Sequence, residues 1–296
     1  MIVSIASGKG GTGKTTVTAS LTRVWEKPLI AGDLDVEDPN LHLFLRPDIE
    51  ECTTAWLDVP VVDESKCTLC GACSKLCQFK AISVMGTLLL TFPEMCHGCG
   101  GCISLCPEGA LSPGKRELGE ISRGHADGAE FLMGRLQIGE AMSPPFMRQV
   151  KARLKDIIAA NGQDAIIDAP PGVSCPAVNA VIDSDVIVLV TEPTPFGFHD
   201  FKLAWEAFSP LGKPMGAVVN RAGIGNDEVQ KFCRRKFIPI IAEIPYERAA
   251  AEAYAQGRII ADLSTEFREI FVSLHAKICE LSELGKRPDL GEAAHA

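Results

Sequence analysis

The sequence predicts an α/β fold in which a mostly parallel sheet is interrupted by a small, cysteine-rich α+β insert. A short apolar strand, a glycine-rich loop and a helix open the chain, and apolar strands alternate with helical segments in its second half. Such alternation is typical of parallel sheets covered by helices on both faces. Between these parts, eight of the 12 cysteines lie between Cys67 and Cys106.

Length and composition indicate an ordinary globular protein, long enough for one large domain and a small one. The 296 residues are 46% hydrophobic and 23% charged, with a formal net charge of −9. This charge argues against a general nucleic-acid binder and gives no attraction to anionic lipid. We find no signal peptide and no apolar run near the roughly 18 residues of a membrane span. We therefore expect a cytoplasmic protein without nucleic-acid or membrane partners, whose cysteines are ligands rather than disulfides.

The first strand, Ile2–Ala6, is followed by the pattern of a phosphate-binding loop and by a helix expected over residues 14–25. Glycines let backbone N–H groups converge on phosphate oxygens, Lys14 can reach the β- and γ-phosphates, and the Thr15 hydroxyl can ligate Mg²⁺. The helix would direct its N-terminal dipole at the same anion. A plain glycine-rich turn is the alternative interpretation. The expected nucleotide-binding residues here are Gly8, Lys9, Gly10, Gly11, Thr12, Gly13, Lys14, Thr15 and Thr16.

Acidic residues end two of the later strands. Asp33 and Asp35 follow an apolar strand that begins at Leu29, and Asp168 ends another. Because the carboxyl ends of parallel strands face the ligand, we expect these carboxylates near the phosphates. Asp168 fits the Walker B position, which holds Mg²⁺ usually through a water. Both segments could instead start turns, since Pro39 and a double proline follow them closely.

Further strands and helices complete the predicted sheet. Asn220 and Arg221 follow one of these strands, and the Asn220 amide can both donate to and accept from an adenine edge. We therefore expect both residues to contribute to nucleotide binding. By hydrophobic pattern, we expect paired strands within residues 117–138, a helix over 144–160, strands at 186–190, 217–219 and 238–244, and a last helix over 263–281.

The cysteines form two runs with one spacing, C-x₂-C-x₂-C-x₃-C, and the second run begins 29 residues after the first. This is the spacing of bacterial ferredoxins with two [4Fe–4S] clusters, in which the fourth cysteine of each run ligates the other cluster. Tetrahedral zinc is the alternative, although zinc generally uses two separated pairs. Gln78 stands where a proline often follows the fourth cysteine, without removing a ligand. The expected ligands are a first set, Cys67, Cys70, Cys73 and Cys106, and a second set, Cys77, Cys96, Cys99 and Cys102.

Taken together, the motifs resemble those of the ParA/MinD-type deviant Walker A ATPases, a group that includes the nitrogenase iron protein and the Mrp-type iron–sulfur carriers. The chain most resembles the branch with an inserted ferredoxin domain. The resemblance is carried by Lys9, by residues 33–35 and 168–172, and by Asn220 and Arg221. It implies a P-loop ATPase domain over residues 1–57 and 116–296, and an insert with two [4Fe–4S] clusters over 58–115.

The resemblance also implies roles for individual residues. Lys9 would cross to the nucleotide of a second subunit in a homodimer that sandwiches two ATP molecules, and would stabilise charge on the transferring phosphoryl group. Asp35 would position the attacking water, which makes Lys9, Lys14 and Asp35 the expected catalytic residues. Thr15, Asp33 and Asp168 would surround Mg²⁺.

Cys175 lies just past residues 168–172, at the spacing where the nitrogenase iron protein places a cysteine of its intersubunit cluster. That protein supplies a second cysteine per subunit, which has no clear counterpart between residues 114 and 161. A buried, unreactive cysteine is the alternative for Cys175. The Mrp-type carriers use a late C-x-x-C, whereas Cys233 and Cys279 are isolated, which weakens the resemblance to carriers.

The sequence therefore favours an ATP-hydrolysing homodimer, with ATP, Mg²⁺ and two [4Fe–4S] clusters as cofactors, that couples nucleotide state to electron transfer. Its partner would be an unidentified redox or cluster-acceptor protein. The insert begins shortly after Asp35, so a nucleotide-dependent shift there would reposition the clusters. ATP-dependent cluster assembly or delivery is one alternative, although clusters held by four cysteines normally stay in place. A positioning or scaffolding ATPase of the ParA/MinD kind is another, against which the negative charge counts.

Overall fold

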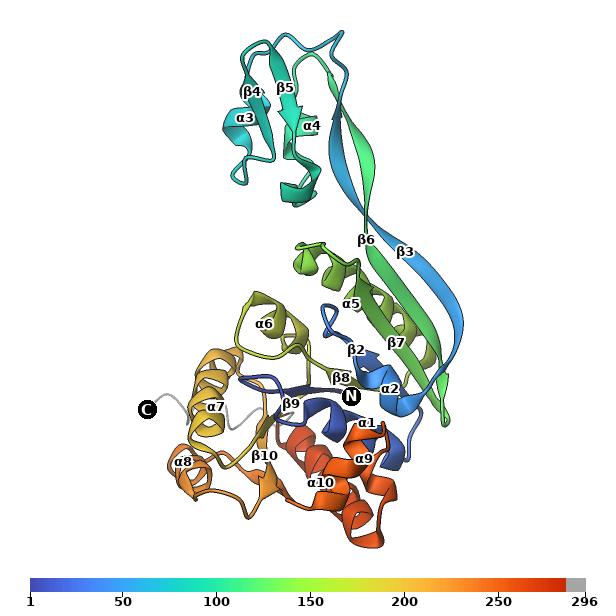
Figure 1. The fold of residues 1–296 in the computed structure, drawn as a ribbon, viewed down its shortest axis with the longest axis vertical. Coiled ribbons are helices and arrows are strands. Elements are labelled where there is room, and N and C mark those ends of the chain that lie inside the picture. The colour runs from blue at the N-terminus through green and yellow to red at the C-terminus, as the bar shows by residue number, and fades with distance from the viewer. Residues whose placement is uncertain (286–296) are drawn as a thin grey trace.

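The main body of the protein is a nine-stranded sheet covered by helices on both faces (Figure 1). The computed structural model describes residues 1–285, so the end of the predicted ATPase domain, residues 286–296, lies outside the described residues. The strand order is β11-β10-β9-β1-β8-β2-β7-β6-β3. The parallel strands are β1 (Ile2–Ala6), β2 (Leu29–Asp33), β7 (Ala129–Leu136), β8 (Asp164–Asp168), β9 (Val186–Thr191), β10 (Met215–Ala222) and β11 (Ile240–Pro245).

The parallel arrangement brings several strand ends to one edge of the sheet. β1 runs parallel to both β8 and β9, with Ile5 opposite Asp168 and Val188. β2, on the other side of β8, places Asp33 opposite Asp168. Strands β2, β8 and β9 are buried throughout, as the near-continuous apolar runs of a sheet covered on both faces require. The predicted mostly parallel α/β sheet is thus confirmed.

Helices on the two faces build two hydrophobic cores. One face is covered by α1 (Lys14–Val24), the short α2 (Leu41–Leu45) and α10 (Thr265–Gly285). The other is covered by α5 (Ser143–Asn161), α6 (Cys175–Val181), α7 (Pro195–Phe208) and α8 (Glu228–Lys236). The helices predicted over 144–160 and 263–281 are confirmed as α5 and α10, with slightly different ends. No helix within residues 1–285 is long and apolar enough to cross a membrane.

A long antiparallel ribbon leaves this sheet at one edge (Figure 1). Its strands are β3 (Asp48–Val62) and β6 (Leu111–Ala126), and β6 joins the sheet by pairing with β7 over residues 119–126. The predicted strands within 117–138 are therefore present, but β6 starts earlier and pairs with β3, which the sequence analysis did not anticipate. In β3 buried and exposed residues alternate only from Ala55 to Val59, and Pro60 interrupts the strand pattern.

The far end of the ribbon holds a small unit over residues 63–110. It contains α3 (Ala72–Leu76), a hairpin of β4 (Ile82–Met85) and β5 (Leu88–Thr91), the short helix η1 (Pro93–Met95), and α4 (Gly101–Leu105). The predicted insert boundaries, 57/58 and 115/116, fall inside the two ribbon strands.

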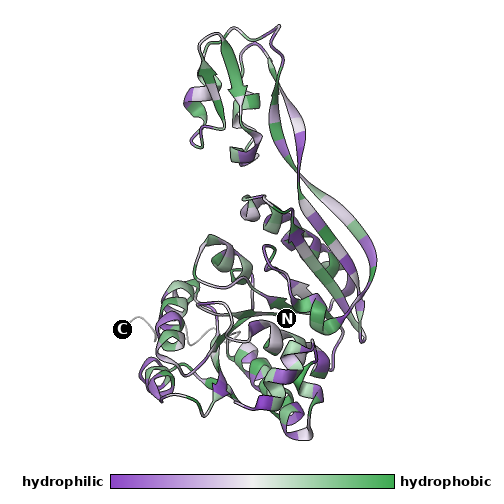
Figure 2. Cartoon of the chain, viewed as in Figure 1, coloured by the Kyte–Doolittle hydropathy of each residue, from purple (hydrophilic) through white to green (hydrophobic). Residues whose placement is uncertain are grey.

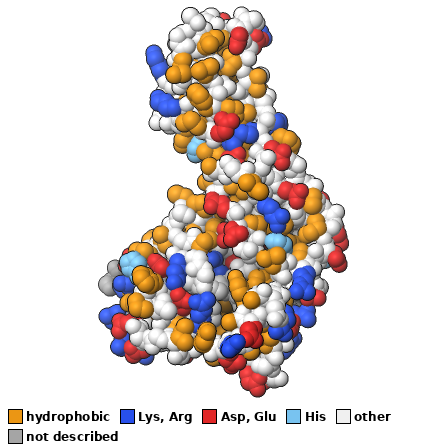
Figure 3. Space-filling model, in the orientation of Figure 1, with side chains coloured by type: hydrophobic (Ala, Val, Ile, Leu, Met, Phe, Trp, Pro, Cys, Tyr) orange, Lys and Arg blue, Asp and Glu red, His pale blue; other side chains and the backbone are white. Residues whose placement is uncertain are grey.

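Little apolar area is buried inside the small unit. Its core consists of Cys73 and Ile82 together with Leu111, the first residue of β6, and a few half-buried neighbours. Figure 2 shows the hairpin as strongly hydrophobic, and Figure 3 shows hydrophobic side chains grouped on the visible face of the unit. So small a core gives little stability by itself. The exposed large hydrophobic residues here are Leu76, Phe79, Met85, Leu88, Leu90, Phe92, Met95 and Leu105.

Candidate nucleotide site and cysteine cavities

The glycine-rich loop joins β1 to α1 and lines a cavity at the carboxyl edge of the sheet. Gly13, immediately before α1, has a φ of 98°, a conformation that side chains disfavour. A Cβ at this position would also lie 2.2 Å from the Asn220 Nδ2 atom. Glycine is therefore required at this position for its conformation and for its size. Of the predicted residues, Gly10, Gly11, Gly13, Lys14, Thr15, Thr16 and Asp35 line the cavity.

Gly8 and Thr12 do not line that cavity but shape the loop. A Cβ on Gly8 would lie 1.9 Å from the Asp200 carbonyl oxygen, so the loop passes closely against α7. The Thr12 carbonyl oxygen accepts a hydrogen bond of 2.8 Å from Asn220 Nδ2. These contacts hold the loop against helix α7 and strand β10.

Asp168 and Asp35 flank the buried Lys14. Burial raises the pKa of Asp168 to about 6, against the opposing effects of Lys14 and of the Thr15 and Thr18 hydroxyls. Burial also raises the pKa of Asp35 to about 7, again opposed by Lys14. The Asp168 Oδ1 atom is buried and has no hydrogen-bond partner. A buried carboxylate oxygen without a partner needs an explanation. Beside a phosphate-binding loop, a cation that this oxygen coordinates, directly or through water, would provide one.

Asp33 is fully buried and anchors the segment that carries Asp35. Its Oδ1 accepts a 3.0 Å hydrogen bond from the Asp35 N–H, and its Oδ2 accepts one of 3.0 Å from each of the Asn40 and Leu41 N–H groups. Burial and the neighbouring Asp168 raise the pKa of Asp33 well above its usual value. The carboxylate thus fixes the loop after β2, while its predicted place near Mg²⁺ remains a prediction.

Lys9 is bound within its own subunit by a residue that the sequence analysis did not identify. Its Nζ lies 2.6 Å from Glu192 Oε1, and Arg221 Nη1 lies 2.6 Å from Glu192 Oε2. Burial opposes ionisation of Glu192, but Lys9 and Arg221 outweigh it and lower the pKa. Glu192 directly follows β9. Because the carboxyl ends of parallel strands face the ligand, the reasoning that selected Asp33 could also have selected Glu192.

Asn220 and Arg221 lie beside a second cavity that adjoins the first one. That cavity is lined by both residues, by Gly13 and Thr16, by residues 244–247, and by Ala250, Ala251 and Tyr254 of α9 (Arg248–Ala255). The Asn220 amide is engaged with the loop, since its Oδ1 accepts from the Arg221 N–H while its Nδ2 donates to Thr12. Each of these atoms keeps one further hydrogen-bonding position, so the Asn220 amide can contact adenine without giving up the loop.

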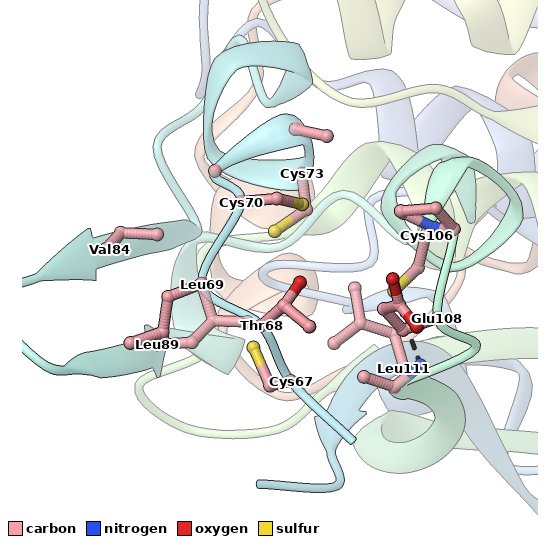
Figure 4. A pocket seen from close by; sticks show the side chains of 14 residues that line it. Cys67, Thr68, Leu69, Cys70, Cys73, Val84, Leu89, Cys106, Glu108 and Leu111 are labelled. Atoms are coloured by element: carbon pink, nitrogen blue, oxygen red, sulfur yellow. Dashed lines mark hydrogen bonds between the residues drawn. The ribbon is translucent and has the colours of Figure 1, made fainter.

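The two predicted cysteine sets line two separate cavities of the small unit. One is lined by the first set, Cys67, Cys70, Cys73 and Cys106, whose side chains Figure 4 shows around it. The other is lined by the second set, Cys77, Cys96, Cys99 and Cys102. Each cavity therefore collects three cysteines of one run and the fourth cysteine of the other.

The thiols of each set influence one another and receive backbone hydrogen bonds. Burial raises the pKa of Cys73, with smaller contributions from Cys70 and Cys106. Burial likewise raises the pKa of Cys102, with contributions from Cys96 and Cys99. The Ala110 N–H donates to the Cys106 sulfur over 3.3 Å, and the Gly98 N–H donates to the Cys96 sulfur over 3.4 Å.

No compact single-ion site is formed by these thiols. Within residues 1–285, no group of three or more His, Cys, Asp or Glu side chains is arranged to hold a metal ion. Ligands of one zinc ion converge to about 2.3 Å from it. The thiols line the two cavities, and the clusters that they would hold remain a prediction.

Cys175 begins α6 and is exposed, so it is not the buried cysteine of the alternative interpretation. The residues on either side of it, Ser174 and Pro176, line the nucleotide cavity. Cys233, by contrast, is buried, and burial raises its pKa to about 11. The described residues leave the ligand role of Cys175 a prediction.

Sequence comparison decides the family. The profile of the CobQ/CobB/MinD/ParA nucleotide binding domain family matches residues 3–260. The chain belongs to this family. Two uncharacterized proteins of Methanocaldococcus jannaschii are each 30% identical to this family member, one over 262 residues and the other over 283. The first alignment covers 87% of this chain and 90% of the relative, and the second covers 95% and 97%.

Solved structures with the same fold include two archaeal MinD proteins. The septum site-determining protein MinD of Pyrococcus horikoshii, complexed with Mg-ADP, has a TM-score of 0.58 at 20% identity and covers 97% of this chain and 99% of its own. The cell division ATPase MinD of Pyrococcus furiosus has a TM-score of 0.56 at 23% identity, covering 95% and 98%. This likeness supports a MinD-like fold for this family member.

We expect Gly13→Ala to abolish ATP binding without unfolding the protein, because the new Cβ would displace the Asn220 amide and strain the loop. Gly212→Ala is the matched control, since Gly212 has a φ of 65° but a Cβ there meets nothing within 4 Å. Calorimetric titration with MgATP, alongside circular dichroism, measures both effects. Wild-type affinity in Gly13→Ala would contradict this assignment of the loop.

Proposed function

We propose that this protein is an ATP-hydrolysing homodimer in which nucleotide state controls electron transfer through two [4Fe–4S] clusters. The observation that carries the proposal is the sorting of eight cysteines into two cavities, one for each predicted ligand set. Membership of a nucleotide-binding family supports the ATP site. The fold alone assigns no reaction, because one fold hosts many functions and the residues of the sites decide among them.

The nucleotide cavity supports ATP hydrolysis through charges already present at its edge. Lys14 would contact the β- and γ-phosphates, while Thr15 and the unpartnered Asp168 Oδ1 would hold Mg²⁺. Bound Mg²⁺ would neutralise charge on the transferring phosphoryl group. Asp35 lines the same cavity, and its segment is held by Asp33, so it would orient the attacking water.

Lys9 would complete the site of the partner subunit. To do so it must leave Glu192, whose other carboxylate oxygen stays paired with Arg221. Leaving a buried carboxylate unpaired is costly, and Arg221 removes much of that cost. Lys9 would exchange its contact with Glu192 for one with the phosphate of the nucleotide bound to the partner subunit. Dimerisation would therefore depend on ATP.

The cysteine cavities fit cubane clusters in ligand type, number and grouping. Four thiols surround each cavity, and backbone N–H groups already donate to two of the sulfur atoms. Such hydrogen bonds tune the reduction potential of a cluster. A bound cluster would supply one-electron transfer. Cluster binding would also contribute the folding free energy that the three-residue core of the small unit cannot provide.

The comparisons favour a second candidate function, that of a positioning ATPase. This chain shares its fold with the MinD proteins. The comparisons support the ATPase part of the proposal and do not address the cysteine-rich unit. ATP-dependent co-sedimentation with liposomes or DNA, in a preparation with full iron content, would favour this candidate. ATP-dependent movement of labelled iron into an apo-protein would instead indicate cluster delivery.

The two lysines of the loop have different expected effects. Lys14→Ala should lose nucleotide binding, because no other cation replaces it against the phosphates. Lys9→Ala should keep binding but lose hydrolysis and ATP-dependent dimerisation. Nucleotide titrations, phosphate release and light scattering measure these properties. Full turnover by the Lys9 variant would reject its role across the subunit interface.

Single cysteine substitutions test the two ligand sets. Cys67→Ala and Cys106→Ala, from different runs, should lose the same cluster because they line one cavity. Cys77→Ala should lose the other cluster. Cys52→Ala is the matched control, as Cys52 is exposed and belongs to neither set. Iron content and electron paramagnetic resonance of the reduced proteins would show this, and different spectra for the first two variants would exclude the crossed assignment.

Coupling is tested by redox titration of the reconstituted protein with ATP, with ADP and without nucleotide. We expect the midpoint potential of at least one cluster to change with nucleotide state, because the two states make different contacts at the loop that follows β2. Lys14→Ala should show no such change. Identical titrations of the wild type in all three conditions would refute the proposed coupling.

A further inference from the structure

We propose that the buried ion pair of Arg116 and Glu140 transmits nucleotide state from the ATP cavity to the second cysteine set. This inference rests on the proposed function and names the residues that would perform its coupling. Neither residue carries a recognisable motif, and neither lines the nucleotide cavity.

Arg116 joins the main body to the small unit. It lies in β6, its side chain is only 14% exposed, and it pairs with Glu140, which is 7% exposed. Its Nη2 also donates to the carbonyl oxygen of Cys96 over 3.4 Å. One guanidinium thus contacts a carboxylate of the main body and the backbone of a predicted cluster ligand.

Glu140 belongs to the segment between β7 and α5, and both ends of this segment reach the nucleotide cavity. Before it, the Leu136 N–H donates to the Val36 carbonyl oxygen over 2.8 Å, and Val36 lines the cavity next to Asp35. After it, Glu140 Oε1 accepts a 2.7 Å hydrogen bond from the Met142 N–H, and the next residue, Ser143, lines the cavity. A nucleotide that moves either lining residue would therefore move Glu140.

The second cysteine set is packed against the ribbon, whereas the first set is not. Cys96 packs against the hydrophobic core that extends from the main body to Leu57 and Val59 of β3. A Cβ on Gly98 would lie 2.4 Å from Leu57 Cδ1 on β3, so this loop sits directly on the ribbon. Asp58 and Pro60 of β3 line the second cavity, while residues 67–111 alone line the first.

Stability does not explain why this pair is buried. A buried ion pair costs desolvation that a hydrophobic pair of similar size avoids. The Arg116 Nε atom is also buried without a hydrogen-bond partner, which adds to the cost. Because the buried guanidinium cannot lose Glu140 without a further penalty, it must follow when Glu140 moves. The Cys96 backbone would then move with it.

Arg116→Met tests this inference, with Lys115→Met as the matched control. Lys115 is the preceding residue on β6, 65% exposed, and pairs with Asp58 over 2.7 Å at the surface. Arg116→Met should keep wild-type iron content and basal ATP hydrolysis. The ATP-dependent shift in midpoint potential of the cluster that needs Cys77 should nevertheless fall to within measurement error. Lys115→Met should keep the full shift.

A second variant keeps the test decisive if Arg116→Met loses iron. Arg116→Lys retains the charge but lacks the planar fork that contacts Glu140 and Cys96 together, so the shift should shrink with iron retained. A wild-type shift in an iron-loaded Arg116 variant would overturn the inference and leave the proposed function intact. The absence of any shift in the wild type would instead refute the proposed function itself.

Discussion

The candidate active site depends on the balance of charge around Lys14. Asp35, Asp168 and Asp33 gather at the edge of the sheet because β2 and β8 are parallel neighbours in register. Burial raises the pKa of each of these carboxyl groups, and the single nearby lysine offsets only part of this for Asp35 and Asp168. Such a site gains most from a divalent cation held beside phosphate, which supplies the missing positive charge. The proposed requirement for Mg²⁺ with nucleotide thus rests on the sheet register.

Charge balance also determines the surroundings of Glu192, next to Lys9 of the glycine-rich loop. Glu192 is the one carboxylate of the described site that is fully paired, with Lys9 and Arg221, and its pKa is lowered accordingly. Carboxylates without a full complement of positive charge therefore lie on the Asp35 and Asp168 side of the loop, whereas the charge on the Glu192 side is neutralised. Lys9 can leave Glu192 because Arg221 remains paired with that carboxylate. Beside Asp35 and Asp168, no second cation takes the place of Lys14 in this way.

The ribbon of β3 and β6 places the small unit beyond the sheet without a flexible linker. Its strands pair from Asp48 to Val62 along their length, so movement at the sheet edge is carried outward by hydrogen-bonded backbone. The ribbon contacts the loop that contains Cys96 and Gly98, and Arg116 links this loop to Glu140 of the main body. The cavity of the first set is lined by residues 67–111 alone and includes Cys73 and Leu111 of the small core. Electrons would thus pass between a cluster near the nucleotide domain and one at a distance from it.

Local patterns predicted much of the fold and of the candidate site. The glycine-rich loop, Asp33, Asp35 and Asp168 all follow from strand ends and their topology, and the cysteine spacing alone led to two sets of four. The sequence did not reveal β3, because Pro60 and several acidic residues obscure its alternation. Nor did it reveal Glu192 or the Arg116–Glu140 pair, since charged residues outside a motif have the pattern of ordinary surface residues.

By itself, therefore, the sequence determined which chemical groups the protein carries. These are a phosphate-binding loop, acidic residues at strand ends and eight cysteines in two runs. Only the tertiary structure decided which charges are paired and which part of the small unit lies against the nucleotide domain. The spacing of cysteines along the chain predicts the ligand sets, because the local backbone conformation fixes how residues close in sequence lie relative to one another. Burial and partner choice depend on contacts between distant segments, such as Lys9 with Glu192 and Arg116 with Glu140, and no local pattern encodes them.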